Sequence, residues 1–184
     1  MDSTTLVFLA DGFEELEAIA IIDILRRANI SIQTVSITEN RSVIGTHNVP
    51  LIADTTLHQL PVNIQPQAII LPGGMPGALN LANSKPLLQL IQSQNKAQRL
   101  LAAICAAPTV LAKAGVGVNE VIATCYPGFE EQMTGFTLEE SEVVNSHHFI
   151  TAQGPAFAIP FALAIVARLC GQECTEEVKQ GMLL

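Results

Sequence analysis

Short apolar runs alternate along the chain with longer stretches whose apolar residues recur at helical spacing. Runs that are apolar throughout are typical of strands buried on both faces of a parallel sheet. Predicted strands cover residues 6–10, 30–37, 68–71, 100–104, 121–124, 143–144 and 149–151, with two short ones around 43–44 and 49–52. Predicted helices cover residues 13–28, 79–95 with a break near Pro86, 106–114, 157–170, and a last one from about Glu176.

This alternation predicts an α/β fold in which helices cover both faces of a mostly parallel sheet. The sequence contains no repeat, low-complexity tract or linker, so we expect residues 1–184 to form one domain. Ligands of such folds bind beyond the carboxyl ends of the strands. Three segments follow strands directly and are the first places to look for chemistry: residues 11–17, 72–77 and 105–108.

Composition narrows the classes of protein. With 49% hydrophobic and 14% charged residues, the chain is unlike a disordered protein. Its net charge of −8 and the absence of a Lys/Arg cluster argue against nucleic-acid binding. The longest apolar runs, such as residues 158–167, are far shorter than the roughly 20 residues that span a bilayer. We therefore expect no membrane association.

The cysteines and the N-terminal residues bear on location. Residues 6–10 are apolar but no positive residue precedes them, so we expect no signal peptide. Four scattered cysteines without a Cys-x-x-Cys pair do not form a secreted disulfide framework. We expect a cytoplasmic protein with reduced thiols.

Cys170 and Cys174 lie four residues apart, but no second ligand pair accompanies them, so we expect no metal site.

Cys105 lies between a predicted strand and a predicted helix, with Ala103 and Ala107 two positions to either side. Small flanking residues at a sharp strand-to-helix turn are the pattern of a nucleophile elbow. A helix N-terminus below the sulfur would favour the thiolate, so we expect a lowered pKa for Cys105. The alternative is a buried structural cysteine, which is the commonest environment of a free cysteine.

Glu17 lies on the apolar stripe of the first predicted helix, with Ala20, Ile21 and Ile24 on the same face. A carboxyl group in this position is desolvated, which raises its pKa and allows it to donate a hydrogen bond to a thiolate. The alternative is a side chain that extends to the rim of the stripe. Asp11 and Glu14 have the spacing of a capping box at the start of the same helix.

A glycine-rich loop, Pro72-Gly73-Gly74-Met75-Pro76-Gly77, follows the strand at residues 68–71. It matches neither nucleotide-binding motif in glycine spacing. We interpret it as an oxyanion pocket in which the Gly74 and Ala106 N–H groups are the donors, with a plain turn as the alternative.

Four blocks, Glu-Glu-Leu-Glu, Ile-Leu-Pro-Gly-Gly, Ala-Ala-Ile-Cys-Ala-Ala-Pro and Gln-Gly-Pro, resemble in order and spacing those of the ThiJ/PfpI superfamily. The resemblance extends over nearly the whole chain, and is strongest to the branch of the parkinsonism-associated protein deglycase and its small bacterial relatives. It implies a flavodoxin-like three-layer sandwich, a homodimer and no cofactor. It also implies a reactive Cys105 paired with a protonated Glu17, and an oxyanion and substrate pocket around Gly73, Gly74 and Ala106.

The same resemblance places Arg27 and His47 near the dimer contact, with His47 where the deglycase has an arginine. Ala106 stands where peptidase-type members carry a histidine, which argues against peptidase activity. Tyr126 stands where the deglycase branch has a histidine beside the substrate pocket, and a tyrosine is a poor base at pH 7. Cys125 precedes it and is either buried filler or a second oxidation site.

These observations predict a cofactor-independent glyoxalase or deglycase, a lyase or hydrolase that acts on methylglyoxal, glyoxal or their early protein or nucleotide adducts. The alternative is a redox-responsive stress protein or chaperone whose Cys105 is oxidised to a sulfinate without significant turnover. A role in thiamine metabolism rests on family labels alone. The first helix carries apolar residues on more than one face, which independently favours a homodimer.

Overall fold

A computed structural model describes residues 4–118 and 120–184 of the chain. At its centre lies a seven-stranded sheet with the order β10-β11-β7-β6-β1-β2-β5, in which only β10 pairs antiparallel to its neighbour. The strands are β1 (Thr5–Leu9), β2 (Ile32–Ser36), β5 (Thr55–Thr56), β6 (Ala68–Leu71), β7 (Leu100–Ile104), β10 (Val143–Ser146) and β11 (Phe149–Ala152). The predicted mostly parallel sheet is confirmed.

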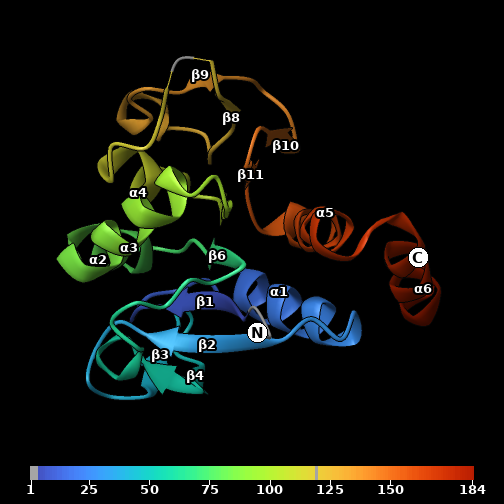
Figure 1. Ribbon diagram of the computed structural model, residues 1–184, viewed down its shortest axis with the longest axis horizontal. Coiled ribbons are helices and arrows are strands. Elements are labelled where there is room, and N and C mark those ends of the chain that lie inside the picture. Colours follow the sequence, from blue (N-terminus) through green and yellow to red (C-terminus); the bar gives the residue numbers. More distant parts are fainter. Residues whose placement is uncertain (1–3, 119) are drawn as a thin grey trace.

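Helices cover both faces of this sheet and complete the three-layer sandwich (Figure 1). On one face, α1 (Glu15–Arg27) and α5 (Ala158–Cys170) bury Ile21 and Phe161 against strand residues such as Ile70. On the other, α3 (Lys85–Lys96) and α4 (Pro108–Lys113) pack against neighbouring strand residues such as Ile69. Because successive side chains of a strand point to opposite faces, each fully apolar strand supplies both cores.

The remaining elements lie around this sandwich. Two short sheets flank it: the antiparallel hairpin β3 (Ser42–Ile44) and β4 (Pro50–Ile52), and the parallel pair β8 (Ile122–Ala123) and β9 (Thr137–Leu138). Helix α2 (Gly77–Asn83) precedes α3, and α6 (Gln172–Met182) ends the fold. The 3-10 helices are η1 (Leu57–Gln59), η2 (Glu130–Gln132) and η3 (Pro155–Phe157). No helix of the described ranges is long and apolar enough to cross a membrane.

The break expected near Pro86 is confirmed: residues 79–95 belong to two helices that meet at Ser84, and Pro86 lies in the first turn of α3, where its missing N–H is not needed. Other predicted boundaries were wrong. Helix α6 begins at Gln172 rather than near Glu176, and α4 begins at Pro108 rather than at residue 106. The last difference matters for the site, because it separates Cys105 from the helix.

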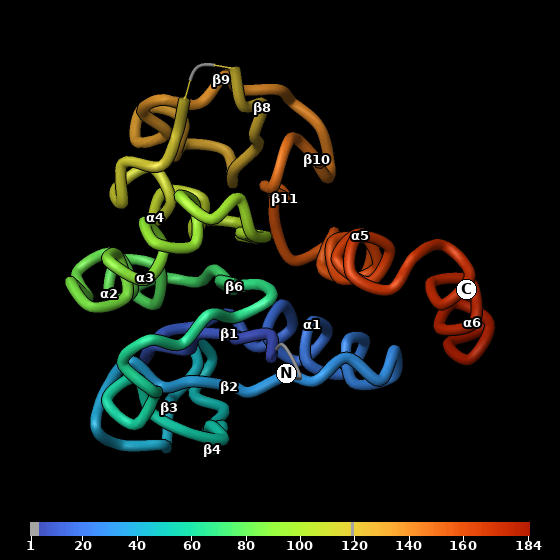
Figure 2. Tube along the Cα trace, viewed as in Figure 1, coloured from blue at the N-terminus to red at the C-terminus, as the bar shows by residue number. Residues whose placement is uncertain are grey.

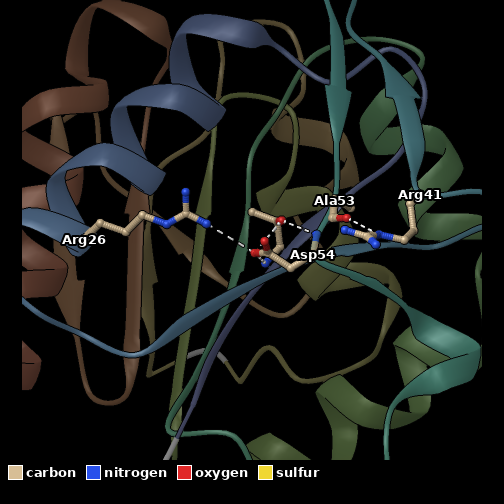
Figure 3. A network of polar contacts seen from close by, with 5 residues as sticks. Arg26, Arg41, Ala53 and Asp54 are labelled. Atoms are coloured by element: carbon tan, nitrogen blue, oxygen red, sulfur yellow. Dashed lines mark hydrogen bonds and ion pairs between the residues drawn. The ribbon is translucent and has the colours of Figure 1, made fainter.

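The β3–β4 hairpin is attached to the sandwich through Asp54 (Figure 3). Its Oδ2 accepts hydrogen bonds from the backbone N and Oγ1 of Thr34 in β2, both at 2.8 Å, and from Arg26 in α1 at 3.3 Å. Next to it, the guanidinium of Arg41 donates to the carbonyl of Ala53 at 2.6 Å. One carboxylate thus joins the segment after β4 to both β2 and α1.

Candidate functional site

The three segments identified in the sequence meet at one edge of the sheet. Strands β7, β6 and β1 are neighbours, and the chain changes direction across the sheet between β1 and β6. Such a switch point opens a crevice at the carboxyl ends of the strands. The N–H of Glu14 donates to the carbonyl of Gly73 at 2.9 Å, and that of Gly77 donates to the carbonyl of Gly12 at 3.1 Å. The loops after β1 and β6 are therefore held together.

Cys105 occupies a sharp turn directly after β7. Its φ is +65°, in the left-handed region that residues other than glycine rarely adopt. Both of its backbone groups are bonded, the N–H to the carbonyl of Ala152 at 2.9 Å and the carbonyl to the N–H of Tyr126 at 2.8 Å. The side chain is 8% exposed, and the flanking Ala103 and Ala107 are buried. The geometry is that expected of a nucleophile elbow.

Glu17 lies in the first turn of α1 and is fully buried, which confirms the burial expected from its place on the apolar stripe. Its Oε2 accepts a hydrogen bond from the N–H of Gly73 at 2.7 Å. Its Oε1 accepts no hydrogen bond from any protein group in the described ranges. An ionised oxygen without a donor is costly in such a position, whereas a protonated one can itself donate. The carboxyl group lies close enough to the thiol of Cys105 for each group to shift the pKa of the other.

Gly73 is the point at which the thiol, the carboxyl group and the glycine-rich loop meet. A Cβ atom at this position would lie 2.6 Å from the Cβ of Cys105 and 2.9 Å from Oε2 of Glu17. Gly74 has φ +91° and is packed against the loop after β1, so it too has no room for a side chain. The N–H groups of Gly74 and Ala106 are directed at the sulfur of Cys105.

Burial is the largest influence on the pKa values of Glu17 and Cys105. It raises the pKa of Glu17 from 4.5 to about 7, against the stabilising hydrogen bond from Gly73. Burial and the charge of Glu17 raise the pKa of Cys105 to about 12, although the Gly74 and Ala106 N–H groups oppose this. The expectation of a lowered cysteine pKa was therefore wrong. That expectation assumed that a helix begins directly after Cys105, but α4 begins three residues further on, at Pro108. Desolvation therefore raises the pKa of the thiol by more than the local N–H groups lower it.

The expected N-terminal cap of α1 was also wrong. Glu14 rather than Asp11 is the capping residue, and its Oε2 accepts from the N–H of Glu17 at 2.7 Å. Asp11 instead accepts from the N–H of Ile44 in β3 at 2.8 Å. The cause is Gly12, whose φ of +85° makes a turn before the helix begins.

Tyr126 borders the site through its backbone and its ring. Its N–H is bonded to the carbonyl of Cys105, and its ring lies against Gly154 and forms an edge contact with Phe129 at a centroid distance of 6.4 Å. The side chain is 44% exposed. Cys125, the preceding residue, is buried, and burial raises the pKa of its thiol to about 11.

Arg27 and His47 are not brought to Cys105 within one chain. Arg27 lies at the far end of α1 from Glu17, about 15 Å along the helix axis, and its guanidinium is bonded to Asp23 at 2.6 Å. His47 lies in the turn between β3 and β4 and its Nδ1 is 2.9 Å from Oε2 of Glu15. Both side chains are exposed.

Glu14, Glu15 and His47 could each offer one ligand atom within 4.8 Å of the others. These atoms already make hydrogen bonds: Glu14 caps α1, and Glu15 accepts from the N–H groups of His47 and Val49. We assign no metal to them.

The sequence pattern did not reveal the residues that hold the two loops in place. Thr46 in the hairpin donates from Oγ1 to the carbonyl of Met75 at 3.0 Å, and the N–H of Gly12 donates to the carbonyl of Ile44 at 2.7 Å. In the sequence, the turn at Gly12 is indicated only by the presence of a glycine directly after Asp11. Beside the site, a cavity of about 320 Å³ lies over α2 and α4, but neither Cys105 nor Glu17 lines it.

Comparisons with known proteins agree with this geometry. Residues 3–168 match the DJ-1/PfpI family. The protein dj-1beta of Drosophila melanogaster is 37% identical to this chain, over 100% of this chain and 98% of its own length. The crystal structure of Drosophila melanogaster DJ-1beta superposes with a TM-score of 0.93 and covers 100% of this chain and 99% of that one. A Caenorhabditis elegans relative, glutathione-independent glyoxalase DJR-1.2, is 33% identical over 99% of this chain and 96% of its own. This chain belongs to the DJ-1/PfpI family.

Proposed function

We propose that the protein is a cofactor-independent glyoxalase or deglycase that converts small dicarbonyl compounds such as methylglyoxal, or their early adducts, into hydroxy acids. The observation that carries the proposal is the fully buried Glu17, whose Oε1 accepts no hydrogen bond from the described protein groups and which lies close to the thiol of Cys105. The name of the Caenorhabditis elegans relative supports the same reaction class.

In the proposed reaction the Cys105 thiolate attacks the aldehyde carbon and forms a hemithioacetal. The N–H groups of Gly74 and Ala106, which are directed at the sulfur, stabilise the oxyanion that develops. Glu17 then moves a proton between the two neighbouring carbons of the bound substrate, because a carboxyl group with a pKa of about 7 both gives and takes protons near neutrality. Water releases the hydroxy acid and restores the thiol.

The accessibility of the sulfur is consistent with a small substrate. Cys105 is 8% exposed, so a two- or three-carbon aldehyde approaches it more easily than a bulky side chain does. Tyr126 is the neighbouring polar group and can donate a hydrogen bond to the substrate, but it is a poor base at pH 7. We therefore expect Glu17 to carry out the proton transfers.

The test is the formation of lactate from methylglyoxal. Wild type should produce lactate, whereas Cys105→Ala and Glu17→Ala should lose the activity. Cys125→Ala removes a buried neighbouring thiol without touching the proposed nucleophile and is the matched control. Lactate formation by Cys105→Ala at the wild-type rate would exclude this mechanism.

A redox function of Cys105 is the second candidate. It is favoured by Tyr126, which places no imidazole beside the substrate, and one solved relative, Toxoplasma gondii DJ-1, carries the description "oxidized". Mild peroxide followed by mass measurement distinguishes the two. Selective gain of two oxygen atoms on Cys105, in a protein that forms no lactate, would support the redox function and contradict the enzymatic one.

We also propose a homodimer that forms through the exposed face of α1. Leu16 is 57% exposed and Ile19 is 52% exposed, while the opposite face of the helix packs on the sheet and α5. Exposed neighbouring apolar side chains on a helix favour burial against a second copy. The unpaired state of all four cysteines is consistent with a cytoplasmic location.

A further inference from the structure

The turn of the β3–β4 hairpin is bonded to both loops of the candidate site. The hairpin lies outside the sandwich, below β1 and β2 in the view of Figures 1 and 2. The N–H of Thr46 donates to the carbonyl of Phe13, in the loop after β1, at 2.8 Å. Its Oγ1 donates to the carbonyl of Met75, in the loop after β6, at 3.0 Å. One half-buried residue thus joins the hairpin to both loops.

Glu15 fixes this hairpin turn. Its side chain is 13% exposed, and its Oε1 accepts from the N–H groups of His47 at 2.7 Å and of Val49 at 3.4 Å. Its Oε2 lies 2.9 Å from Nδ1 of His47. Gly45 packs directly on the same carboxyl group, where a Cβ atom would overlap it. Because Glu15 lies in the first turn of α1, the turn is held by the helix that also carries Glu17.

The peptide groups of the glycine-rich loop before Met75 are held by the sandwich itself. The N–H of Gly73 donates to Oε2 of Glu17 at 2.7 Å, and the carbonyl of Gly74 accepts from an N–H in the first turn of α2 at 2.9 Å. The carbonyl of Met75 is the next along the chain, and its partner is the hydroxyl of Thr46. The loop between β6 and α2 is therefore held at one of its carbonyl groups by a side chain of the hairpin.

The same loop reaches both reactive groups at Gly73. A Cβ atom at this position would lie 2.6 Å from the Cβ of Cys105 and 2.9 Å from Oε2 of Glu17, so a small displacement of the loop changes the surroundings of both. Burial raises the pKa of Glu17, and the hydrogen bond from Gly73 opposes this. Gly74, with φ +91°, has no side chain to fix its conformation, so the position of this segment depends on the groups bonded at its two ends.

We propose that Thr46 is a positioning residue of the candidate site. Its hydroxyl holds the carbonyl of Met75 in place, and this keeps the N–H of Gly73 aligned with Oε2 of Glu17. Thr46 acts through the loop and not on the reacting atoms. The inference deepens the proposed function, on which it rests for the role of Glu17 in proton transfer. Without the hydroxyl the loop moves, the bond from Gly73 weakens, and the carboxyl group stays protonated to higher pH.

The test compares Thr46→Val, which keeps the shape of the side chain but removes the donor, with Thr46→Ser, which keeps the donor. Alkylation of Cys105 by iodoacetamide is measured by mass between pH 5 and 10. In Thr46→Val we expect the midpoint of this profile to rise by about 0.3–1 pH unit, which corresponds to roughly a two- to tenfold loss in stabilisation of the ionised carboxyl group. Thr46→Ser should restore the wild-type midpoint. Glu14 and Cys105 are the titratable groups that act on Glu17, and both remain in place.

Lactate formation from methylglyoxal is measured on the same variants. The kcat of Thr46→Val should fall by about two- to tenfold at pH 7 while KM stays within about twofold of wild type, because the displaced groups act in the transition state. A wild type that forms no lactate would count against the proposed function alone, since the alkylation profile requires no turnover.

Thr38→Val is the matched control. The Oγ1 of Thr38 donates to the carbonyl of Asn40 at 3.0 Å, which is the same kind of bond, but it lies before the hairpin and touches neither loop of the site. Its alkylation midpoint and kcat should equal those of wild type. The proposal is overturned if Thr46→Val keeps the wild-type midpoint, if Thr38→Val shifts it equally, if Thr46→Ser fails to restore it, or if an active Thr46→Val keeps the wild-type kcat.

Discussion

Glu17 and Cys105 lie close together, so their protons leave in two steps that belong to the pair. The first proton is lost near pH 7 and the second near pH 12. Between these values the pair holds a single proton. Burial and the charge of Glu17 keep that proton mainly on the sulfur, and its transfer to Glu17 gives a thiolate that the N–H groups of Gly74 and Ala106 stabilise.

This leads to a prediction for the pH dependence of Cys105 reactivity. Alkylation by iodoacetamide should increase as pH rises through about 7, because an ionised Glu17 can take the proton of the thiol as the sulfur reacts. In Glu17→Gln the carboxyl group no longer titrates, and burial alone keeps the pKa of the thiol high. The midpoint should therefore move to higher pH, as measured by mass-resolved alkylation of Cys105 between pH 5 and 10.

The opposite shift would have a clear meaning. If Glu17→Gln lowered the midpoint, the charge of Glu17 would only hold the proton on sulfur, and Glu17 would take no part in moving it. Its proposed role as proton donor would then be wrong. Cys125→Ser is the control, because it should leave the profile of Cys105 unchanged.

Gly73 gives a second prediction at this scale. In Gly73→Ala the new methyl group would overlap both Cys105 and Glu17, so we expect a loss of about 1–3 kcal/mol in the free energy of unfolding and a strong loss of lactate formation. Gly181→Ala is the control, since a Cβ there meets nothing within 4 Å and alanine favours the helix. Urea unfolding of both variants measures the difference. Equal stability of Gly73→Ala and wild type would contradict the packing described.

The sequence was sufficient to find Glu17 and Cys105, because helical periodicity and small flanking residues are local features. It was not sufficient for their ionisation. The pKa of Cys105 depends on how much of the folded chain surrounds the sulfur, and that is set by residues distant in sequence, such as Gly73 and Tyr126. The capping role of Glu14 was missed for a similar reason, since the turn at Gly12 depends on packing against Pro76.

At the scale of the elements, the attachment of the hairpin through Asp54 is the clearest target. Asp54→Ala removes the acceptor of the buried N–H of Thr34, so we expect a loss of about 1–3 kcal/mol in the free energy of unfolding. Arg26→Ala removes only an exposed ion pair to the same carboxylate and should change stability by less than about 1 kcal/mol. Urea midpoints of the two variants provide the comparison, and an equal loss in both would show that the ion pair rather than the Thr34 contacts carries the attachment.

Elements with a strong local pattern were predictable, and elements defined by their partners were not. Strands β6 and β7 are apolar throughout and were found with their observed limits. Strand β5, only Thr55–Thr56, has no apolar pattern and exists because it pairs with Val35 and Ser36. The start of α6 was missed because Gln172 and Glu173 are polar and exposed, and nothing in their pattern distinguishes a helix from a loop.

At the scale of the whole molecule, the proposed dimer can be tested by changing the exposed face of α1. Leu16→Glu together with Ile19→Glu would place two charges in the proposed interface, and we expect the mass in solution to fall from that of a dimer to that of a monomer. Light scattering at micromolar concentration measures this. Val62→Glu, at a fully exposed apolar position, is the control and should leave the mass unchanged. A monomeric wild type would end the proposal.

The left-handed backbone of Cys105 has an evolutionary consequence. A residue with a side chain costs about 1–2 kcal/mol in this conformation, whereas glycine adopts it freely. Selection for backbone stability alone would therefore favour glycine at position 105, whereas selection for the thiol favours cysteine. In a population of variants, a screen for folding should therefore enrich glycine at position 105, whereas a screen for reactivity should enrich cysteine.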